Sequence, residues 1–298
     1  MEVELDLGLG EEPTEIAQIS DIHFNYCLPE KEEDEEVNNS RLHRIWLANG
    51  SSVSSALAAM DAASYCDQTV VTGDTVDYLS KGALELTVKH IFERDPSVIC
   101  TLGGHDITKQ MQTGQPNKLS VDERLDIIRS AWIHDIFYYS RDVGSKVIAV
   151  GLDNGQGIFH PMQVEKLKAD ICRARNEGKI ILIFQHEPLS TGKPEDNNVP
   201  SLLDYANYKS AYNFYDGAIM CAPEKLNGAT AELYSLICEN ADVIRAVFNG
   251  HLHAVFYTEI KASYKDADGN AVSATIPQYT ATANAYFKNG IITRIIVK

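Results

Sequence analysis

Short runs of β-forming apolar residues alternate with helical patterns along most of the chain. The six clearest runs lie at residues 15–20, 69–72, 98–102, 147–152, 179–185 and 243–248. Between several of them, apolar residues recur at spacings of three and four, as in helices that pack by one face; the clearest examples are residues 54–65, 83–92, 121–133 and 162–175. This order predicts an α/β domain whose strands are largely buried.

The sequence after Gly250 has a different pattern, because three predicted strands follow one another without helices between them. These strands span residues 254–260, 275–280 and 291–297, and residues 266–270 have the composition of a turn. They are expected to form an antiparallel sheet that completes the same body. No repeat, long linker or low-complexity tract divides the 298 residues. We therefore predict a single domain over residues 1–298.

The charge of the chain argues against several classes of partner. The sequence has 26 Lys and Arg residues against 42 Asp and Glu residues, which gives a net charge of −16. Because attraction to nucleic-acid backbones and to anionic lipids needs a basic surface, neither nucleic-acid coating nor membrane docking is expected. An acidic protein can still act on a small phosphorylated substrate when bound metal ions supply local positive charge.

Other features favour a cytoplasmic location. The longest apolar runs, such as Ile180–Phe184, are too short to cross a bilayer. The N-terminus is acidic, whereas a signal peptide begins with positive charge. The six cysteines include no CxxC pair, so we interpret them as reduced thiols. Nothing in the sequence indicates an oligomeric state.

Histidine and aspartate residues occur where the predicted buried strands end. The segments are Asp21-Ile22-His23, Gly73-Asp74-Thr75-Val76-Asp77, Gly103-Gly104-His105-Asp106, His186 and Gly250-His251-Leu252-His253. The loops at the carboxyl ends of strands form the ligand crevice of α/β sheets, so these residues can converge there. Imidazole and carboxylate groups suit Zn, Mn or Fe. Each segment alone is more often structural, but the ordered set of five indicates a shared metal site.

These five segments, in this order, resemble the signature of the calcineurin-like metallophosphoesterases. That signature reads Asp-x-His, Gly-Asp-x-x-Asp, Gly-Asn-His-Asp/Glu, a lone His and Gly-His-x-His. The resemblance spans residues 16–253. It implies an αββα four-layer sandwich, in which helices flank two central mixed sheets. It also implies a metal-dependent hydrolase of phosphomonoester or phosphodiester bonds with a dinuclear metal centre.

The resemblance implies a role for each motif residue. The first metal would be held by Asp21, His23 and His253, the second by His186 and His251, and both by Asp74. The two divalent ions, drawn from Mn, Fe, Zn or Ni, would generate a bridging hydroxide that attacks phosphorus. His105 would protonate or stabilise the leaving group, with Asp106 orienting its imidazole. Asp77 would support Asp74 or a ligand histidine, with a plain turn carboxylate as an equal alternative.

One position departs from the family signature, because Gly104 stands where the third motif has asparagine. The resemblance implies that this asparagine gives its amide oxygen to the second metal, and glycine has no side chain to offer. A water molecule, another residue or a weakened site would account for the difference. We therefore expect the second ion to be held less tightly than the first.

Two other functions are compatible with parts of the sequence. A non-catalytic metal-binding scaffold with a degraded second site would explain Gly104, but such a protein has no need of His105 and Asp106. A metal-dependent amidohydrolase would use the same types of ligand. In that class His-x-His usually opens the series of motifs near the N-terminus, whereas here it closes the series.

Residues that would contact a substrate are less well defined. Asn25 and Tyr26 follow the first motif, at the expected rim of the site, as do Arg41 and His43. Ordinary loop residues are the competing interpretation. The tyrosines at positions 205, 208, 212 and 215 would either line a pocket or pack in the protein. No motif names the substrate or distinguishes a monoester from a diester.

Overall fold

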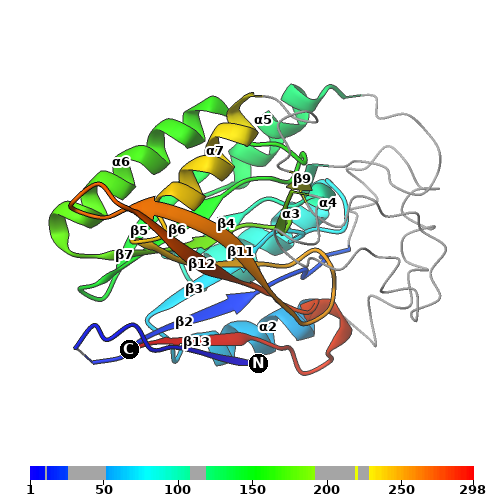
Figure 1. Cartoon of the computed structure of the whole chain (residues 1–298). Coiled ribbons are helices and arrows are strands. Elements are labelled where there is room, and N and C mark those ends of the chain that lie inside the picture. The colour runs from blue at the N-terminus through cyan, green and yellow to red at the C-terminus, as the bar shows by residue number, and fades with distance from the viewer. Residues whose placement is uncertain (11, 26–51, 108–118, 192–218, 221–227) are drawn as a thin grey trace, which may run out of the picture.

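The computed structural model describes residues 1–10, 12–25, 52–107, 119–191, 219–220 and 228–298. Its central feature is a pair of mixed β-sheets that share a core (Figure 1). In order across the first sheet, the strands are β1 (Glu2–Leu5), β13 (Thr293–Val297), β2 (Thr14–Ile19), β3 (Gln68–Thr72) and β4 (Ile99–Thr101). Across the second, they are β11 (Phe256–Lys265), β12 (Ala271–Thr280), β10 (Ile244–Asn249), β7 (Ile180–Phe184), β6 (Val147–Leu152) and β5 (Tyr138–Val143). A short pair, β8 (Leu189–Ser190) and β9 (Ile219–Met220), is separate.

The strands that precede the motif segments run parallel to one another within each sheet. In the first sheet β2 pairs with β3, and β3 with β4, all in parallel. In the second sheet β10 pairs with β7, and β7 with β6, also in parallel. The carboxyl ends of these strands therefore lie along one edge of each sheet, where ligand sites of α/β proteins are found.

Side chains of the central strands alternate between two apolar layers. In β7, Phe184 lies in the core between the sheets, where its ring stacks on that of Phe248 with centroids 5.2 Å apart. Its neighbour Ile183 faces the opposite way, into the layer formed with helices α6 and α7. Burial of both faces explains why these strands are apolar at successive positions instead of at every second one.

Helices cover the outer face of each sheet, which completes four layers (Figure 1). The first sheet is covered by α2 (Ser52–Ala63), α3 (Lys81–Thr87), the π-helix η2 (Val88–Phe92) and α5 (Val121–Ala131). The second is covered by α6 (Pro161–Glu177) and α7 (Gly228–Glu239). The remaining short helices are α4 (Gly104–Ile107) and η5 (Asn284–Tyr286). The predicted αββα sandwich of two mixed sheets is therefore confirmed. The single domain over residues 1–298 stays a prediction.

Local sequence signals set the start of helix α5 and both ends of helix α6. Ser120 accepts a hydrogen bond from the backbone of Glu123, whose carboxylate accepts one from the backbone of Ser120, so a capping box begins α5. Proline opens α6 at its first position, and Gly178 ends it in the left-handed conformation, with φ 62°.

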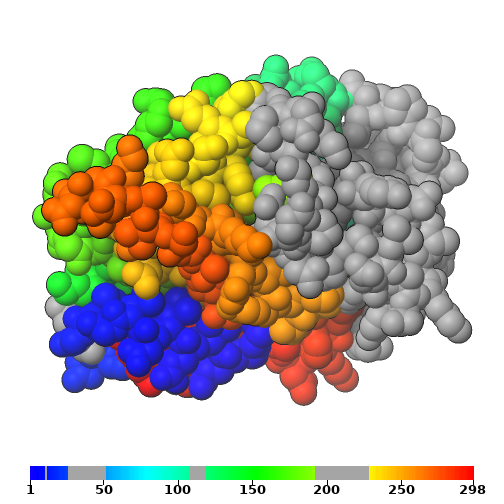
Figure 2. Space-filling model, viewed as in Figure 1, coloured from blue at the N-terminus to red at the C-terminus, as the bar shows by residue number. Residues whose placement is uncertain are grey.

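The prediction of one antiparallel sheet after Gly250 is wrong in its connectivity. Strands β11 and β12 do form an antiparallel hairpin, but β12 pairs in parallel with β10. The last strand, β13, joins the other sheet between β1 and β2, where Ile295 and Val297 enter the core between the sheets. Figure 2 shows the hairpin in orange across the viewed face, between helix α7 in yellow and the N-terminal strands in blue.

Two further predictions concern membrane-spanning segments and the state of the cysteines. Within the ranges that the structure describes, no helix combines the length and apolarity needed to cross a membrane. The cysteines in those ranges, Cys66, Cys100, Cys172 and Cys238, are free thiols.

Candidate metal centre

The five motif segments meet at one end of the sandwich, although they follow strands of both sheets. Those after β2, β3 and β4 belong to the first sheet, and those after β7 and β10 belong to the second. The two sets come into contact: His186 Nε2 lies 3.2 Å from Asp74 Oδ2, and His253 Nε2 lies 3.1 Å from Asp21 Oδ1. The structure thus brings all six predicted ligands into one cluster that spans the sheets.

Five of these six residues have left-handed backbone conformations. The φ angles are 53° at Asp21, 52° at His23, 49° at Asp74, 66° at His251 and 54° at His253. Positive φ is unfavourable for residues with a β-carbon, and such strain persists only where the surrounding structure enforces it. Each of these residues belongs to the cluster of candidate ligands. Such strain is concentrated at functional sites in other proteins.

The first half of the cluster, here called the four-ligand group, consists of Asp21, His23, Asp74 and His253. One oxygen or nitrogen from each residue lies within 4.8 Å of the others. The Nε2 atoms of His23 and His253 face each other at 3.1 Å. Asp21 Oδ2 accepts hydrogen bonds from Ser20 Oγ at 2.6 Å and from the His251 backbone at 3.1 Å, whereas the buried Oδ1 has no hydrogen-bond partner among the described residues. A buried carboxylate oxygen that faces ring nitrogens fits a cation better than it fits an apolar core.

The second half, here called the three-ligand group, consists of Asp74, His186 and His251. His251 Nδ1 lies 3.2 Å from His186 Nε2, which in turn faces Asp74 Oδ2. Asp74 belongs to both groups, and its second oxygen, Oδ1, accepts the backbone N–H of His105 at 2.9 Å. The geometry therefore offers one carboxylate between two sets of imidazoles, as a pair of divalent cations requires.

The charges of the ion-free cluster compensate one another. Burial raises the pKa of Asp74, but the positive charges of His186 and His105 outweigh it and hold that pKa well below 3.8. Burial opposes a charge on His186, yet Asp74 raises its pKa to about 10. Burial and the charge of His186 together lower the pKa of His251 to about 4. A metal needs the neutral imidazole and the ionised carboxylate, so binding of a cation would release protons from this cluster.

The imidazole of His105 lies beside the cluster and contacts a different aspartate from the one expected. His105 Nδ1 lies 2.9 Å from the backbone oxygen of Asp77 and 3.3 Å from its Oδ1. Asp106 instead accepts the backbone N–H groups of Val76 at 2.9 Å and of Gly103 at 2.7 Å. The prediction that Asp106 orients the imidazole is therefore wrong. Asp106 lies within the short helix α4, and its carboxylate bonds to the backbone of the two preceding loops.

Asp77 connects several side chains of the site. Its Oδ1 lies 3.5 Å from His23 Nδ1 as well as close to His105, and its Oδ2 accepts Asn25 Nδ2 at 3.1 Å. Of the two alternatives from the sequence, support of a ligand histidine is the one that the contacts favour. Asn25 is half-buried and lies at the edge of the site, bonded to Asp77. The other predicted substrate residues, Tyr26, Arg41, His43 and the tyrosines at 205–215, lie outside the described residues.

The backbone at Gly104 has room for a side chain. Its φ is not positive, and a β-carbon there would meet only the carbonyl oxygen of Gly155, at 3.6 Å. The preceding Gly103 is different, because a β-carbon would come within 2.5 Å of the Asp74 backbone nitrogen. Glycine is thus required at 103 but not at 104, where the sequence departs from the family signature.

We therefore expect the two ions to be held unequally, and Gly104→Asn to tighten the three-ligand group by roughly tenfold or more, a scale set by the effect of a lost ligand partner. Stepwise chelation followed by titration with Mn²⁺ measures both affinities. Gly104→Ala is the matched control, because it adds the β-carbon without the amide oxygen and should leave both affinities unchanged. Two equally tight ions in the unmodified protein would contradict the expectation.

Two residues that the sequence analysis did not single out brace the site from β6. Asn154 is fully buried, and its Oδ1 accepts the backbone N–H groups of His186 at 3.1 Å and Glu187 at 3.0 Å. Its Nδ2 donates to the Glu187 carbonyl at 2.8 Å. Asp153, just before it, accepts the backbone N–H of Gly155 at 2.9 Å. The signal was present in the sequence, because both residues follow a predicted buried strand.

Asp153→Asn should stabilise the ion-free protein in a pH-dependent way. Burial raises the pKa of Asp153 from 3.8 to about 7. The folded state therefore keeps a proton that the unfolded state has lost, and stability falls as pH rises between these two values. Asparagine removes that effect and can still accept the Gly155 N–H. We expect a gain of at most about 4 kcal/mol in the free energy of unfolding at pH 8 and little gain near pH 4, measured by urea denaturation. Equal gains at both pH values would contradict this cause.

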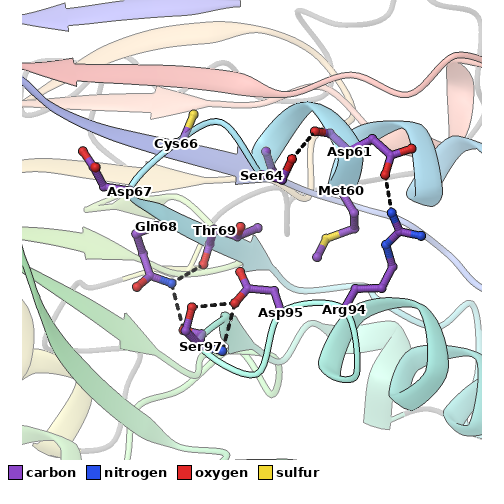
Figure 3. A pocket seen from close by; sticks show the side chains of 11 residues that line it. Met60, Asp61, Ser64, Cys66, Asp67, Gln68, Thr69, Arg94, Asp95 and Ser97 are labelled. Carbon is purple, nitrogen blue, oxygen red and sulfur yellow. Dashed lines mark hydrogen bonds and ion pairs between the residues drawn. The ribbon is translucent and has the colours of Figure 1, made fainter.

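A cavity of about 320 Å³ lies at the other end of the first sheet (Figure 3). It is lined by residues of the end of α2, the start of β3 and the loop before β4, including Asp61, Gln68 and Arg94. Gln68 begins β3, whereas Asp74 follows its other end at Thr72. The cavity is therefore separate from the metal centre.

The chain is similar to known proteins in sequence and in structure. The sequence model described as calcineurin-like phosphoesterase matches residues 14–255. Among solved structures, the chain is similar to a dimetal phosphatase from Danio rerio, with a TM-score of 0.49, 13% identity and coverage of 94% of this chain and 91% of that one. It is also similar to a purple acid phosphatase from yellow lupin (Lupinus luteus) seeds, with a TM-score of 0.47, 12% identity and coverage of 92% of this chain and 45% of that one. A third similar structure is the calcineurin-like phosphoesterase YfkN from Bacillus subtilis, with a TM-score of 0.37, 13% identity and coverage of 93% of this chain and 95% of that one. No curated protein matches the sequence significantly.

Proposed function

We infer the function from the premise that the chain belongs to the calcineurin-like phosphoesterase family, whose sequence model covers residues 14–255. We propose that it is a metal-dependent hydrolase of a small phosphorylated substrate, acting on a phosphomonoester or a phosphodiester. The observation that carries this proposal is the place of Asp74, which belongs to both the four-ligand and the three-ligand group. A carboxylate can give one oxygen to each of two cations. The ligand set, carried from the family signature, is the same six residues.

Two divalent cations, when bound, supply a nucleophile near neutral pH by lowering the pKa of water, and they neutralise charge on the phosphoryl oxygens. The chain's own part is to hold the ligands in place. Asp74 is fixed by the backbone of His105, and Asp21 by Ser20 and the backbone of His251. The ligand atoms of each group already lie within 4.8 Å of one another, so an ion would find them close together.

His105 is the group best placed to act on the leaving oxygen. Its Nε2 lies 4.0 Å from Asp74 Oδ2, and 18% of its side chain is exposed, so a substrate can reach it. Burial opposes its charge, but the carboxylates of Asp74 and Asp77 raise its pKa to about 9 in the ion-free protein. With Nδ1 held by the Asp77 carbonyl, Nε2 can carry a proton toward the leaving group.

A scaffold without catalysis is the second candidate, favoured by the missing side chain at Gly104. The two candidates differ in a direct experiment. The chelated protein is assayed on p-nitrophenyl phosphate and on bis(p-nitrophenyl) phosphate, with Mn²⁺, Fe²⁺, Zn²⁺ and Ni²⁺ added back one at a time. Restored turnover supports the hydrolase and shows which ester is preferred. Metal binding without turnover on either ester, for every ion, would favour the scaffold.

A further inference from the structure

The segment Ala281–Tyr286, between β12 and β13, is attached to the four-ligand group but lies beyond residue 255, where the family model ends. It makes backbone hydrogen bonds to the first motif: the N–H of Asn284 donates to the Ser20 carbonyl at 2.8 Å and that of Ala285 to the Asp21 carbonyl at 3.2 Å. It also reaches the last motif, because Thr282 Oγ1 donates to the His253 carbonyl at 3.0 Å. One short segment thus contacts two motifs that are far apart in the sequence, since His23 and His253 are separated by 230 residues.

The last residue of this segment, Tyr286, contacts a predicted metal ligand. Its Oη lies 2.7 Å from His253 Nδ1, and the two rings meet edge to face with centroids 5.2 Å apart. The other ring nitrogen of His253, Nε2, faces Asp21 Oδ1 and His23 Nε2 within the four-ligand group. The two ring nitrogens of His253 therefore face different groups. Nε2 is turned toward the cation position, and Nδ1 is turned toward the phenol.

We propose that Tyr286 is a positioning residue for the metal ligand His253. This inference rests on the metal centre of the proposed function. A ligating imidazole uses one nitrogen for the ion and donates the N–H of the other to an outer partner, which fixes the tautomer and the ring orientation. The phenol oxygen of Tyr286 is that partner. His253 needs one, because its side chain is 19% exposed and lies at the open edge of the cluster, whereas His23 is fully buried.

Core packing does not account for this tyrosine. Tyr286 is 38% exposed, so much of its ring contributes nothing to the interior. Figure 2 shows the red C-terminal segment at the surface of the viewed face. Its hydroxyl is directed at one polar atom of the site, and removal of that hydroxyl alone leaves the ring and its packing in place. The role can therefore be tested without disturbing the fold.

The test isolates the four-ligand group. His251→Ala removes a ligand of the three-ligand group only, so in that background a titration reports one ion. The ion-free protein is titrated with Zn²⁺ in competition with a fluorescent chelator, with and without Tyr286→Phe. Loss of the outer partner should raise the Kd by about 10–100-fold. Thermal unfolding of the ion-free protein should be unchanged, since a structural role for the hydroxyl would lower the melting temperature without the ion as well.

Tyr257→Phe is the matched control. Tyr257 is also exposed, at 55%, and its hydroxyl donates to Glu259 Oε1 on β11, away from the cluster. It should not change the Kd. Tyr286→Ala, which also removes the ring, should weaken the binding of Zn²⁺ at least as much as Tyr286→Phe does. If Tyr286→Phe binds Zn²⁺ as tightly as its parent, this inference is overturned and the proposed function stands. If the unmodified protein binds no divalent ion, both are overturned.

Discussion

Asp74→Ala is expected to release both metal ions and to reduce hydrolysis to background. Asp74 belongs to both ligand groups, with Oδ2 close to His186 and Oδ1 held by the His105 backbone. Loss of an outer partner of a ligand already costs about 10–100-fold in metal affinity, so loss of a ligand shared by two ions should cost more at each. Elemental analysis of the purified variant measures the effect directly.

The control separates the carboxylate charge from the shape of the turn. Asp74 has φ 49°, a conformation that Asn also tolerates, so Asp74→Asn keeps the backbone and removes one negative oxygen. It should lose metal as well, with less disturbance of the fold than alanine. Unchanged metal content in both variants would show that Asp74 is not a shared ligand, and the proposed function would lose its main support.

His105→Ala is expected to keep its metal and to lower turnover by roughly 10²–10⁴, the scale for loss of an acid or base group. The reason is that His105 shares neither ligand group with Asp74, the carboxylate common to both; it groups instead with His23 and Asp77. The loss should be smaller for nitrophenyl esters, whose leaving group needs little protonation. Comparison of kcat on p-nitrophenyl phosphate and on an alkyl phosphate, with metal content measured in parallel, checks this.

Two further variants show which aspartate supports His105. Asp77→Asn should lower kcat, because it weakens the contact with His105 Nδ1, and its metal content must be followed since Asp77 also lies 3.5 Å from His23. Asp106→Asn should act mainly on stability, because its carboxylate bonds to the backbones of Val76 and Gly103. If metal content fell in step with activity in His105→Ala, the imidazole would be a ligand instead.

The clustering of the six candidate ligands could be predicted, because a buried strand and the polar residues that follow it are both visible in the sequence. A buried strand can be recognised as a run of apolar residues. For β6 the predicted and observed bounds agree, at Val147–Leu152. The end of such a run places the next polar residues at the edge of the sheet. That is sufficient for His186, which lies two residues after the end of β7. The same rule, applied to the end of β6, would have found Asp153 and Asn154.

The contacts among those residues could not be predicted, because they depend on how each turn is folded. Asp106 is adjacent to His105 in sequence, yet the helical turn of α4 sends its carboxylate back to Gly103. Asp77 is 28 residues away from His105 but lies against its imidazole. The sheet to which β13 belongs could not be predicted either, since an apolar strand of this kind can pair with strands of either sheet; it lies between β1 and β2.

The metal centre lies between the two sheets, so bound ions would also affect the stability of the fold. Asp21 and Asp74 extend from the first sheet, and His186 and His253 from the second, so the ions would join the two halves of the sandwich. An ion that binds only the folded chain stabilises it by mass action, by about 2.7 kcal/mol at a hundred times its Kd. Scarcity of the ion would then loosen the whole sandwich, and the supply of metal would set the lifetime of the protein together with its activity.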